Sequence, residues 1–330
     1  MTARPAIVCL GAGRMGRGIA VAFAYAGHTV TMIDVKARST DDFAKLEASA
    51  LDEVRKILAS LARLGLLTGA EADTVMARVS VVQANQSKAA LFGAGMVFEG
   101  VPEVVDLKRE VLAAASKQVG RETIIASTTS TILVDDLSSA VQHPDRFLNV
   151  HWLNPAYLIP LVEVSPGERT DPVVVEGVKT RLETIGKVPV VCAASPGFIV
   201  PRIQALAMNE AARMVEEGVA SAGEIDKAIR YGFGFRYAVL GLLEFIDWGG
   251  GDILYYASRY LEDALGSDRY RAPEVISRNM REGRIGLRTG AGFLDYTGLD
   301  VDAYREERLK AMVAMLRHFG LARPPVLESN

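Results

Sequence analysis

Short apolar runs alternate with helix-patterned or turn-rich segments along the first part of the chain. Each run has the length and the Val, Ile, Phe and Leu content of a buried strand. Strands that alternate with crossover segments build a mostly parallel, doubly wound sheet. The pattern therefore predicts an α/β fold with eight strand candidates, at residues 6–10, 29–33, 79–82, 96–99, 123–127, 147–152, 158–164 and 188–191.

A long helix-patterned segment separates the second and third strand candidates. Apolar residues recur there at spacings of mostly three to five between Leu46 and Leu64, as on one face of an amphipathic helix. A second, shorter helix is expected after Thr68-Gly69-Ala70. Together they predict a helical hairpin inserted between two strands of the sheet.

The pattern changes at Ala194-Ser195-Pro196-Gly197, and the remainder of the chain is rich in Ala, Leu, Glu and Arg. Such a composition without strand signals is typical of helices. We place the domain boundary at this break. The expected domains are an α/β domain at residues 1–195 and an all-α domain at residues 196–330.

Length, charge and composition limit the classes of protein to which the chain can belong. A chain of 330 residues can form two domains with sizeable cores. The formal net charge is −3, with both signs scattered, which argues against nucleic acid as a partner. No apolar run reaches the ~18 residues of a membrane span, and no secretory signal pattern opens the chain. We expect a cytoplasmic protein that acts on a small molecule.

The two cysteines, Cys9 and Cys192, lie in apolar, strand-like runs. Neither belongs to a Cys-x-x-Cys or Cys/His ligand pattern. We expect two reduced packing residues, with no disulfide and no metal site.

The first apolar run, residues 6–10, opens directly into the spacing G-x-G-x-x-G. The first glycine permits a tight turn, the second a close approach to a pyrophosphate, and the third close helix packing. Asp34 ends the next run, roughly 20 residues downstream as this fingerprint requires. A glycine-rich turn in another α/β protein is the alternative. The pattern predicts a Rossmann-like site formed by Gly11, Gly13, Arg14, Met15, Gly16 and Asp34.

Asp34 also indicates which dinucleotide is bound. A carboxylate accepts hydrogen bonds from the ribose hydroxyls and repels a 2′-phosphate. Lys36 and Arg38 lie close by in the sequence and weaken this discrimination. We expect NAD as the cofactor.

His151 and Glu163 predict a general base. Glu163 stands alone in an apolar run, and an unpaired buried carboxylate is costly. His151 on the neighbouring strand is the candidate partner, at the edge where doubly wound sheets bind ligands. A Glu that holds one imidazole nitrogen raises the basicity of the other. A purely structural pair within the sheet is the alternative.

Hydroxyl side chains gather at the end of the preceding strand, in Ser127-Thr128-Thr129-Ser130-Thr131. Such runs are common as turn or N-cap residues. One of these hydroxyls can instead bond a substrate alcohol that faces His151. Asn154-Pro155 belongs to the same site or is only a turn.

The sequence resembles the 3-hydroxyacyl-CoA dehydrogenase superfamily, from the glycine loop to Phe293. Its most specific matches are Glu99-Gly100-Val101-Pro102-Glu103 with Lys108, Ala126-Ser127-Thr128-Thr129-Ser130, and His-x-x-Asn-Pro with a Glu twelve positions after the His. The resemblance implies an NAD-dependent dehydrogenase of fatty acid metabolism. It also implies a helical C-terminal domain that forms a homodimer and closes over the active site.

Residue roles follow from the same resemblance. It implies that His151 is the acid/base, Glu163 its partner and Ser130 the hydroxyl ligand. It further implies contacts around the nicotinamide ribose or the substrate from Glu103, Lys108 and Asn154.

Two positions depart from the family pattern. Pro201 stands where the acyl-CoA enzymes have an Asn that helps complete the active site, and Thr128 also replaces an Asn. Pro201 removes a side-chain donor and acceptor and a backbone N–H. These departures put the positioning of a thioester carbonyl in doubt.

Two segments, residues 155–163 and 232–238, are similar instead to a branch that contains gulonate 3-dehydrogenase (lambda-crystallin), carnitine dehydrogenase and a pyridine-carboxylate dehydrogenase. Members of that branch act on small 3-hydroxy acids or related carboxylated substrates. Arg236 suits a substrate carboxylate because a guanidinium pairs with it bidentately. A helix-end or interface ion pair is the alternative role for Arg236.

The expected reaction is reversible oxidation of the 3-hydroxyl of a 3-hydroxyacyl-CoA or small 3-hydroxy acid, with His151 as base. One alternative is a β-hydroxyacid dehydrogenase of the 6-phosphogluconate type, which needs a lysine base, whereas residues 201–216 contain no lysine. The other is a non-catalytic, crystallin-like NAD-binding protein.

Overall fold

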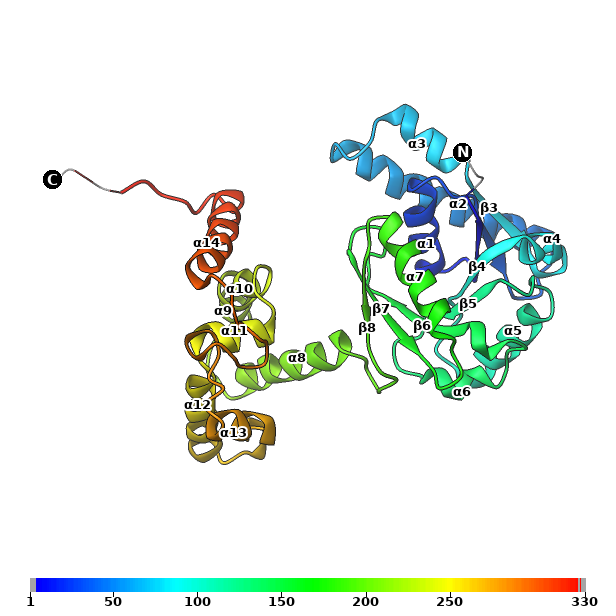
Figure 1. Cartoon of the computed structure of the whole chain (residues 1–330). Helices are drawn as coiled ribbons and strands as arrows, with labels where there is room; N and C mark the ends of the chain where they lie inside the picture. Colours follow the sequence, from blue (N-terminus) through cyan, green and yellow to red (C-terminus); the bar gives the residue numbers. More distant parts are fainter. Residues whose placement is uncertain (1–3, 326, 328–330) are drawn as a thin grey trace. The chain divides into compact units, whose positions relative to one another are not determined.

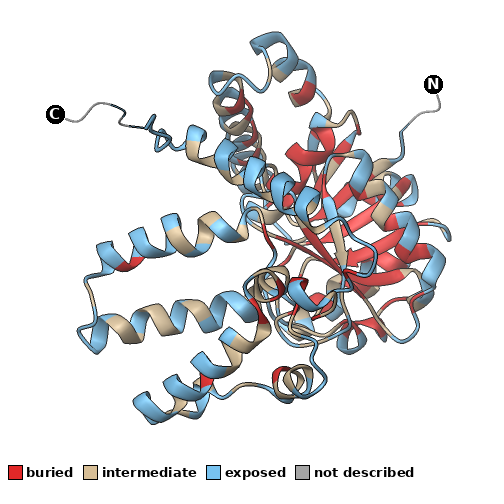
Figure 2. Cartoon of the chain, turned by 60° about the vertical axis from the view of Figure 1, so that its left-hand side comes forward, coloured by how far each residue is buried: buried red, intermediate tan, exposed pale blue. Residues whose placement is uncertain are grey.

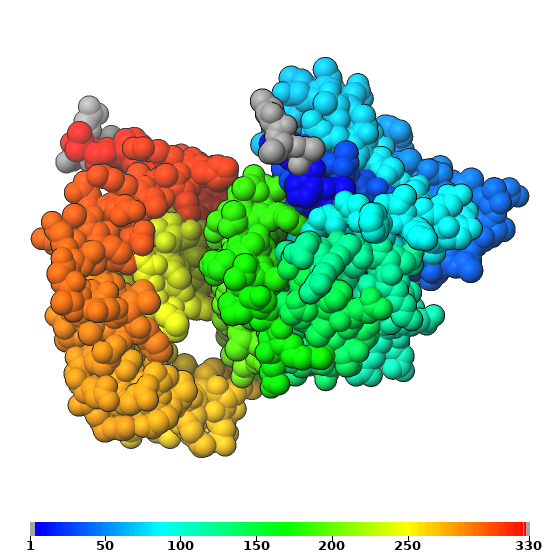
Figure 3. Space-filling view, turned by 45° about the vertical axis from the view of Figure 1, so that its right-hand side comes forward, coloured from blue at the N-terminus to red at the C-terminus, as the bar shows by residue number. Residues whose placement is uncertain are grey.

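The computed structural model describes residues 4–325 and 327. The chain forms two compact units, Met1–Ala207 and Met208–Asn330. In the space-filling view the first unit, coloured blue to green, is a closely packed body (Figure 3). Each unit is described below by itself.

The first unit is built on one eight-stranded sheet in the order β3-β2-β1-β4-β5-β6-β7-β8. All neighbouring strands run parallel except β6 and β7, which are antiparallel. The predicted doubly wound, mostly parallel sheet is therefore confirmed. The strands are β1 (Ala6–Leu10), β2 (Val30–Asp34), β3 (Val79–Gln83), β4 (Ala94–Glu99), β5 (Ile124–Ser127), β6 (Phe147–Trp152), β7 (Leu161–Pro166) and β8 (Val188–Val191).

Helices cover both faces of this sheet (Figure 1). One apolar core lies under α1, α2, α3 and α7, and a second under α4, α5 and α6. Figure 2 shows the buried positions concentrated in the sheet and these helices. The helices are α1 (Arg14–Tyr25), α2 (Thr40–Arg63), α3 (Gly69–Met76), α4 (Lys88–Phe92), α5 (Val105–Ser116), α6 (Val134–Ser138) and α7 (Pro172–Thr184).

The predicted helical hairpin is present as α2 and α3, between β2 and β3. Ser39 caps α2 by accepting from the N–H of Asp42. Thr68 and Glu71 form a reciprocal capping box at the start of α3. These local signals explain where both helices begin.

The strand expected at residues 158–164 is wrong at its start, because β7 begins at Leu161. The N–H groups of Leu158 and Ile159 both donate to the carbonyl of Pro155. These bonds hold the chain in a turn and engage the N–H groups of Leu158 and Ile159, so those two residues do not extend β7.

The second unit is helical. It contains most of α8 (Val200–Glu216), then α9 (Ala222–Ala228), a π-helical segment Ile229–Gly234, α10 (Phe235–Tyr237), α11 (Leu242–Gly249), α12 (Gly251–Leu265), α13 (Glu274–Arg281) and α14 (Val301–His318). Most side chains on these helices are exposed or half-buried (Figure 2). Within the described residues, no helix combines the length and the hydropathy needed to span a membrane.

The boundary expected after Ser195 stays a prediction. The first compact unit extends to Ala207, since the residues after Ser195 pack on the sheet. Phe198 stacks on His151, with ring centroids 5.4 Å apart. The N–H groups of Ile199 and Val200 donate to Glu163.

Candidate active site

The carboxyl ends of the central strands meet at one edge of the sheet. Leu10, Glu99, Ser127 and Asn149 are in register on β1, β4, β5 and β6. The glycine loop follows β1, the hydroxyl loop follows β5, and His151 lies two residues beyond Asn149. The edge predicted to hold the site therefore carries its expected parts.

The glycine loop forms a cradle of bare backbone. Gly11 has a φ of +107°, which disfavours any side chain. A Cβ on Gly16 would lie 2.0 Å from the carbonyl oxygen of Gly11, whereas a Cβ on Gly13 would meet no atom within 4 Å. Gly16 is therefore required for packing, and Gly13 leaves space for a ligand. Arg14 is exposed beside this space, and Met15 packs against the core.

Helix α1 begins at Arg14 without a side-chain cap. No side chain therefore caps the first N–H groups of this helix, which follow directly after Gly13. Free N–H groups at a helix N-terminus bind anions. This arrangement fits the pyrophosphate of a dinucleotide.

Asp34 ends β2 and is almost fully buried. Its Oδ2 accepts from Nε of Arg38 at 2.6 Å, and its Oδ1 accepts from the N–H of Lys36 at 3.3 Å. The carboxylate is thus oriented by two neighbours. It is placed where the fingerprint predicts a ribose contact.

His151 and Glu163 face each other across the antiparallel pair β6 and β7. Nδ1 of His151 lies 2.7 Å from Oε2 of Glu163. The second oxygen, Oε1, accepts from the N–H groups of Ile199 at 2.9 Å and Val200 at 2.8 Å. Both carboxylate oxygens are therefore bonded although the side chain is buried.

These contacts determine the charge of Glu163. Burial raises its pKa, but hydrogen bonds from His151, Val200 and Ile199 outweigh burial, so the pKa lies below its ordinary value. An ionised Glu163 holds a proton on Nδ1 of His151. Nε2 then presents a lone pair, and the imidazole can accept a proton there.

Glu103 organises the hydroxyl loop after β5. Its Oε1 accepts from the hydroxyls of Thr129 and Thr131 and from the N–H groups of Ser130 and Thr131. Burial raises the pKa of Glu103, but the bond from Thr129 and the charge of Lys108 outweigh it and lower the pKa overall. Glu103 thus holds the backbone of Ser130, whose own hydroxyl is not used for this.

Lys108 lies in a buried ion cluster. Its Nζ donates to Oε1 of Glu99 at 2.9 Å and to the carbonyl of Val101 at 3.2 Å, and lies 3.3 Å from Oε2 of Glu103. Ser127 donates to the other oxygen of Glu99. A ligand contact from Lys108 requires one of these partners to be exchanged, so its expected role stays a prediction.

Sequence patterns alone do not assign a role to Glu99 or Thr129. One feature of the sequence could have indicated the role of Glu99: it is a carboxylate at the end of an apolar run. A carboxylate in that setting needs a buried cation as its partner. Thr129 lies within the hydroxyl run, but nothing in its spacing distinguishes it from its neighbours.

Asn154 is exposed beside the glycine loop. It lines a pocket of about 290 Å³ together with Arg14, Arg17 and Tyr157. Two residues expected to contact cofactor or substrate, Arg14 and Asn154, thus border the same space.

The remaining expected positions have local explanations. Thr128 donates its N–H to the carbonyl of Glu99. Pro201 is the second residue of α8, where a helix makes no use of a backbone N–H. Arg236 lies in the second unit, with Nε bonded to the carbonyl of Gly232 and the guanidinium 4.8 Å from the ring of Phe245.

Neither cysteine forms a disulfide, and Cys9 is buried. Burial raises the pKa of the Cys9 thiol to about 12, so it stays protonated. Among the residues that the structure describes, no group of three or more His, Cys, Asp or Glu could hold a metal ion.

The chain matches known proteins along most of its length. Residues 6–195 match the model of the 3-hydroxyacyl-CoA dehydrogenase NAD binding domain, and residues 197–296 match that of the 3-hydroxyacyl-CoA dehydrogenase C-terminal domain. A 3-hydroxyacyl-CoA dehydrogenase structure from Archaeoglobus fulgidus superposes with a TM-score of 0.74 at 31% identity, covering 97% of this chain and 100% of that chain.

Relatives of the chain bear different names. The 5-formyl-3-hydroxy-2-methylpyridine 4-carboxylate 5-dehydrogenase of Mesorhizobium japonicum is 30% identical, over 94% of this chain and 97% of that protein. Lambda-crystallin of Oryctolagus cuniculus is 32% identical, over 78% of each chain. The chain belongs to the 3-hydroxyacyl-CoA dehydrogenase family and is an NAD-dependent oxidoreductase.

Proposed function

We propose that the protein oxidises the 3-hydroxyl of a small 3-hydroxy acid or a 3-hydroxyacyl-CoA to a ketone, reversibly, with His151 as the general base. The observation that carries this proposal is the 2.7 Å contact between Nδ1 of His151 and Oε2 of Glu163. It leaves Nε2 as the proton acceptor at the ligand-binding edge of the sheet.

Three residues have different roles in the proposed reaction. Nε2 of His151 removes the hydroxyl proton, and the Glu163 carboxylate stabilises the imidazolium that forms. The Ser130 hydroxyl bonds the substrate oxygen. Bound NAD⁺ supplies the acceptor for the hydride from the same carbon. The ketone and a protonated His151 result, and in the reverse reaction the proton and the hydride return to the substrate.

Cofactor and substrate contacts extend this proposal. We assign the pyrophosphate to Gly11, Gly13, Arg14, Met15 and Gly16, and the adenosine ribose to Asp34. Glu103, Lys108 and Asn154 are proposed to act around the nicotinamide ribose or the substrate. The bare backbone at Gly13 and the free N–H groups of α1 support the pyrophosphate assignment.

The form of the substrate is a separate question. Pro201 supplies no side-chain donor where a thioester carbonyl would need one. Arg236 offers a guanidinium that suits a free carboxylate. Relatives named for CoA thioesters and one named for a pyridine carboxylate match this chain at about the same identity. Both substrate forms therefore enter the test.

The test is NADH formation by the purified protein with 3-hydroxybutyryl-CoA and, in parallel, with free 3-hydroxy acids that include L-gulonate and carnitine. Turnover of the free acids that is lost in Arg236→Ala supports the small-acid form. Turnover of the thioester substrate alone assigns the protein to oxidation of the 3-hydroxyl of 3-hydroxyacyl-CoA and removes the role of Arg236. No turnover of either class, despite NAD binding, contradicts the proposal and favours a crystallin-like role.

A lysine base is the remaining alternative chemistry. Helix α8, Val200–Glu216, contains no lysine. His151 paired with Glu163 is therefore the base that the site favours.

A further inference from the structure

The loop that joins the two strands of the His151–Glu163 pair needs support. Strand β6 ends at Trp152 and β7 begins at Leu161, so residues 153–160 connect them. Asn154, proposed to contact cofactor or substrate, lies on this loop. The loop therefore carries Asn154 and joins the strand of His151 to the strand of Glu163.

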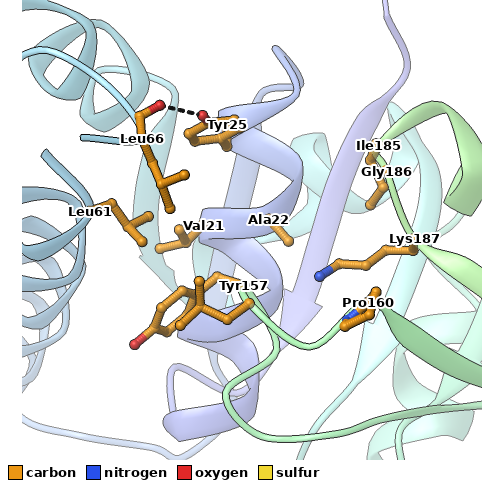
Figure 4. A pocket seen from close by; sticks show the side chains of 11 residues that line it. Val21, Ala22, Tyr25, Leu61, Leu66, Tyr157, Pro160, Ile185, Gly186 and Lys187 are labelled. Atoms are coloured by element: carbon orange, nitrogen blue, oxygen red, sulfur yellow. Dashed lines mark hydrogen bonds between the residues drawn. The ribbon is translucent and has the colours of Figure 1, made fainter. Parts of the chain in front are cut away.

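Lys187 holds this loop at two points. Its Nζ donates to the carbonyl of Ala156 at 2.7 Å and to the carbonyl of Ile159 at 2.8 Å. The same nitrogen lies 5.7 Å from the ring centroid of Trp152. Figure 4 shows the Lys187 side chain reaching from the start of β8 toward the loop that carries Tyr157 and Pro160.

A cavity borders the loop on this side. Tyr157, Leu158 and Pro160 line a cavity of about 280 Å³. Its opposite wall is formed by α1 and the end of the helical hairpin, through Val21 and Leu61 among others (Figure 4). Ala156 itself is buried in the apolar core beside Gly18 of α1, and Tyr157 packs against that core. On the side of the cavity, the two bonds from Lys187 add polar contacts to the carbonyls of Ala156 and Ile159.

A lysine at this position is costly to the fold. Its side chain is only 7% exposed, and burial lowers the pKa of the amine below its ordinary value. An apolar residue of similar length would fill the same space without that cost. The two carbonyl contacts are what an apolar residue cannot supply.

We propose that Lys187 is a positioning residue for the dehydrogenase reaction, which holds the 153–160 loop and through it Asn154 and the His151–Glu163 strand pair. This inference rests on the proposed function. Lys187 touches no reacting atom in this role.

The test compares Lys187→Met with Lys187→Arg, and uses Lys179→Met as the matched control. Lys179 is a partly exposed lysine of α7 that bonds Glu176. We expect Lys187→Met to lower kcat by up to about 10²-fold through misplacement of the site, with the Kd for NAD nearly unchanged. The guanidinium donors introduced in Lys187→Arg should restore part of kcat, and Lys179→Met should match wild type.

Hydrogen exchange gives a readout that does not depend on activity. The N–H groups of Leu158 and Ile159 are bonded inside the loop, so Lys187→Met should speed their exchange while strands β1 and β4 keep their protection. Unchanged exchange of both amides overturns the inference. So does a kcat equal to wild type in folded Lys187→Met, because a purely structural lysine would lower only the Tm.

Chemical rescue tests the donor role directly. In Lys187→Ala the lost side chain adjoins the 280 Å³ cavity, so n-propylammonium can enter and donate to both carbonyls. We expect it to raise kcat, whereas tetramethylammonium, which has no N–H, should not. Equal effects of the two ions overturn the inference. If wild type turns over no substrate, the proposed function fails, and the exchange experiment alone decides the role of Lys187.

Discussion

At the scale of single residues, Glu163 of β7 connects its own strand with His151 and with the start of α8. One oxygen binds His151, and the other binds the backbone at the start of α8. Its sequence position alone predicts the first contact, because an isolated carboxylate in an apolar strand requires a partner on the neighbouring strand. The second contact depends on how residues 196–200 fold back, which no local pattern shows.

Glu163 should make stability depend on pH. Its folded pKa lies below the ordinary value of 4.5, so the carboxylate stabilises the fold above that pH, and the stabilisation is lost as pH falls through the folded pKa. We expect Glu163→Gln to be less stable than wild type near neutral pH. The difference in unfolding free energy between wild type and Glu163→Gln should become smaller below about pH 4.5. Urea unfolding of both proteins near neutral pH and below about pH 4.5 measures this difference. A difference that does not change with pH contradicts the account.

Asp34 should determine the choice between NAD and NADP. Asp34→Ser removes acceptors for the ribose hydroxyls and leaves Arg38, now bonded to Asp34 at 2.6 Å, without its partner. We expect kcat/KM for NAD to fall about tenfold or more, since bonds to charged groups contribute roughly 1.5–3 kcal/mol. Activity with NADP should rise relative to NAD. Parallel kinetics with both cofactors test this, and an unchanged ratio would count against the assigned role.

At the scale of elements, two glycines at the start of α1 have different roles. Gly16 is needed for packing, and Gly13 leaves space for the cofactor. We expect Gly16→Ala to cost about 1–3 kcal/mol of stability, because its Cβ would collide with the carbonyl of Gly11. Gly13→Ala should fold like wild type but bind NAD more weakly, since its Cβ enters open space. Thermal unfolding and NAD titration of both variants measure the two effects. Normal NAD affinity in Gly13→Ala would show that the pyrophosphate lies elsewhere.

Element prediction succeeds where the signal is local. Capping residues and amphipathic spacing predict the α2–α3 hairpin, and apolar runs predict the strands. The start of β7 is different, since Leu158 and Ile159 are apolar and only Pro160 separates them from the strand residues that follow. Leu158 and Ile159 are held outside the strand by local bonds to Pro155 and by the bond from Lys187 to Ile159, 28 residues away. No short-range pattern contains the contact with Lys187.

At the scale of the whole molecule, the second unit buries few of its own apolar side chains. Helix α14 has no fully buried residue, and Met208, Tyr256 and Tyr260 are among the exposed large side chains. Apolar surface of this extent is typical of an interface. We expect a homodimer, measurable by light scattering as twice the monomer mass. A monomer at all accessible concentrations would contradict this expectation.

We propose His151, held by Glu163, as the base of an NAD-dependent oxidation. The most direct test of this role is NADH formation by wild type and His151→Ala with the best substrate of the panel, with NAD binding measured separately. We predict a kcat lower by about 10²–10⁴-fold in His151→Ala, with NAD affinity retained. Normal turnover by His151→Ala would contradict the account.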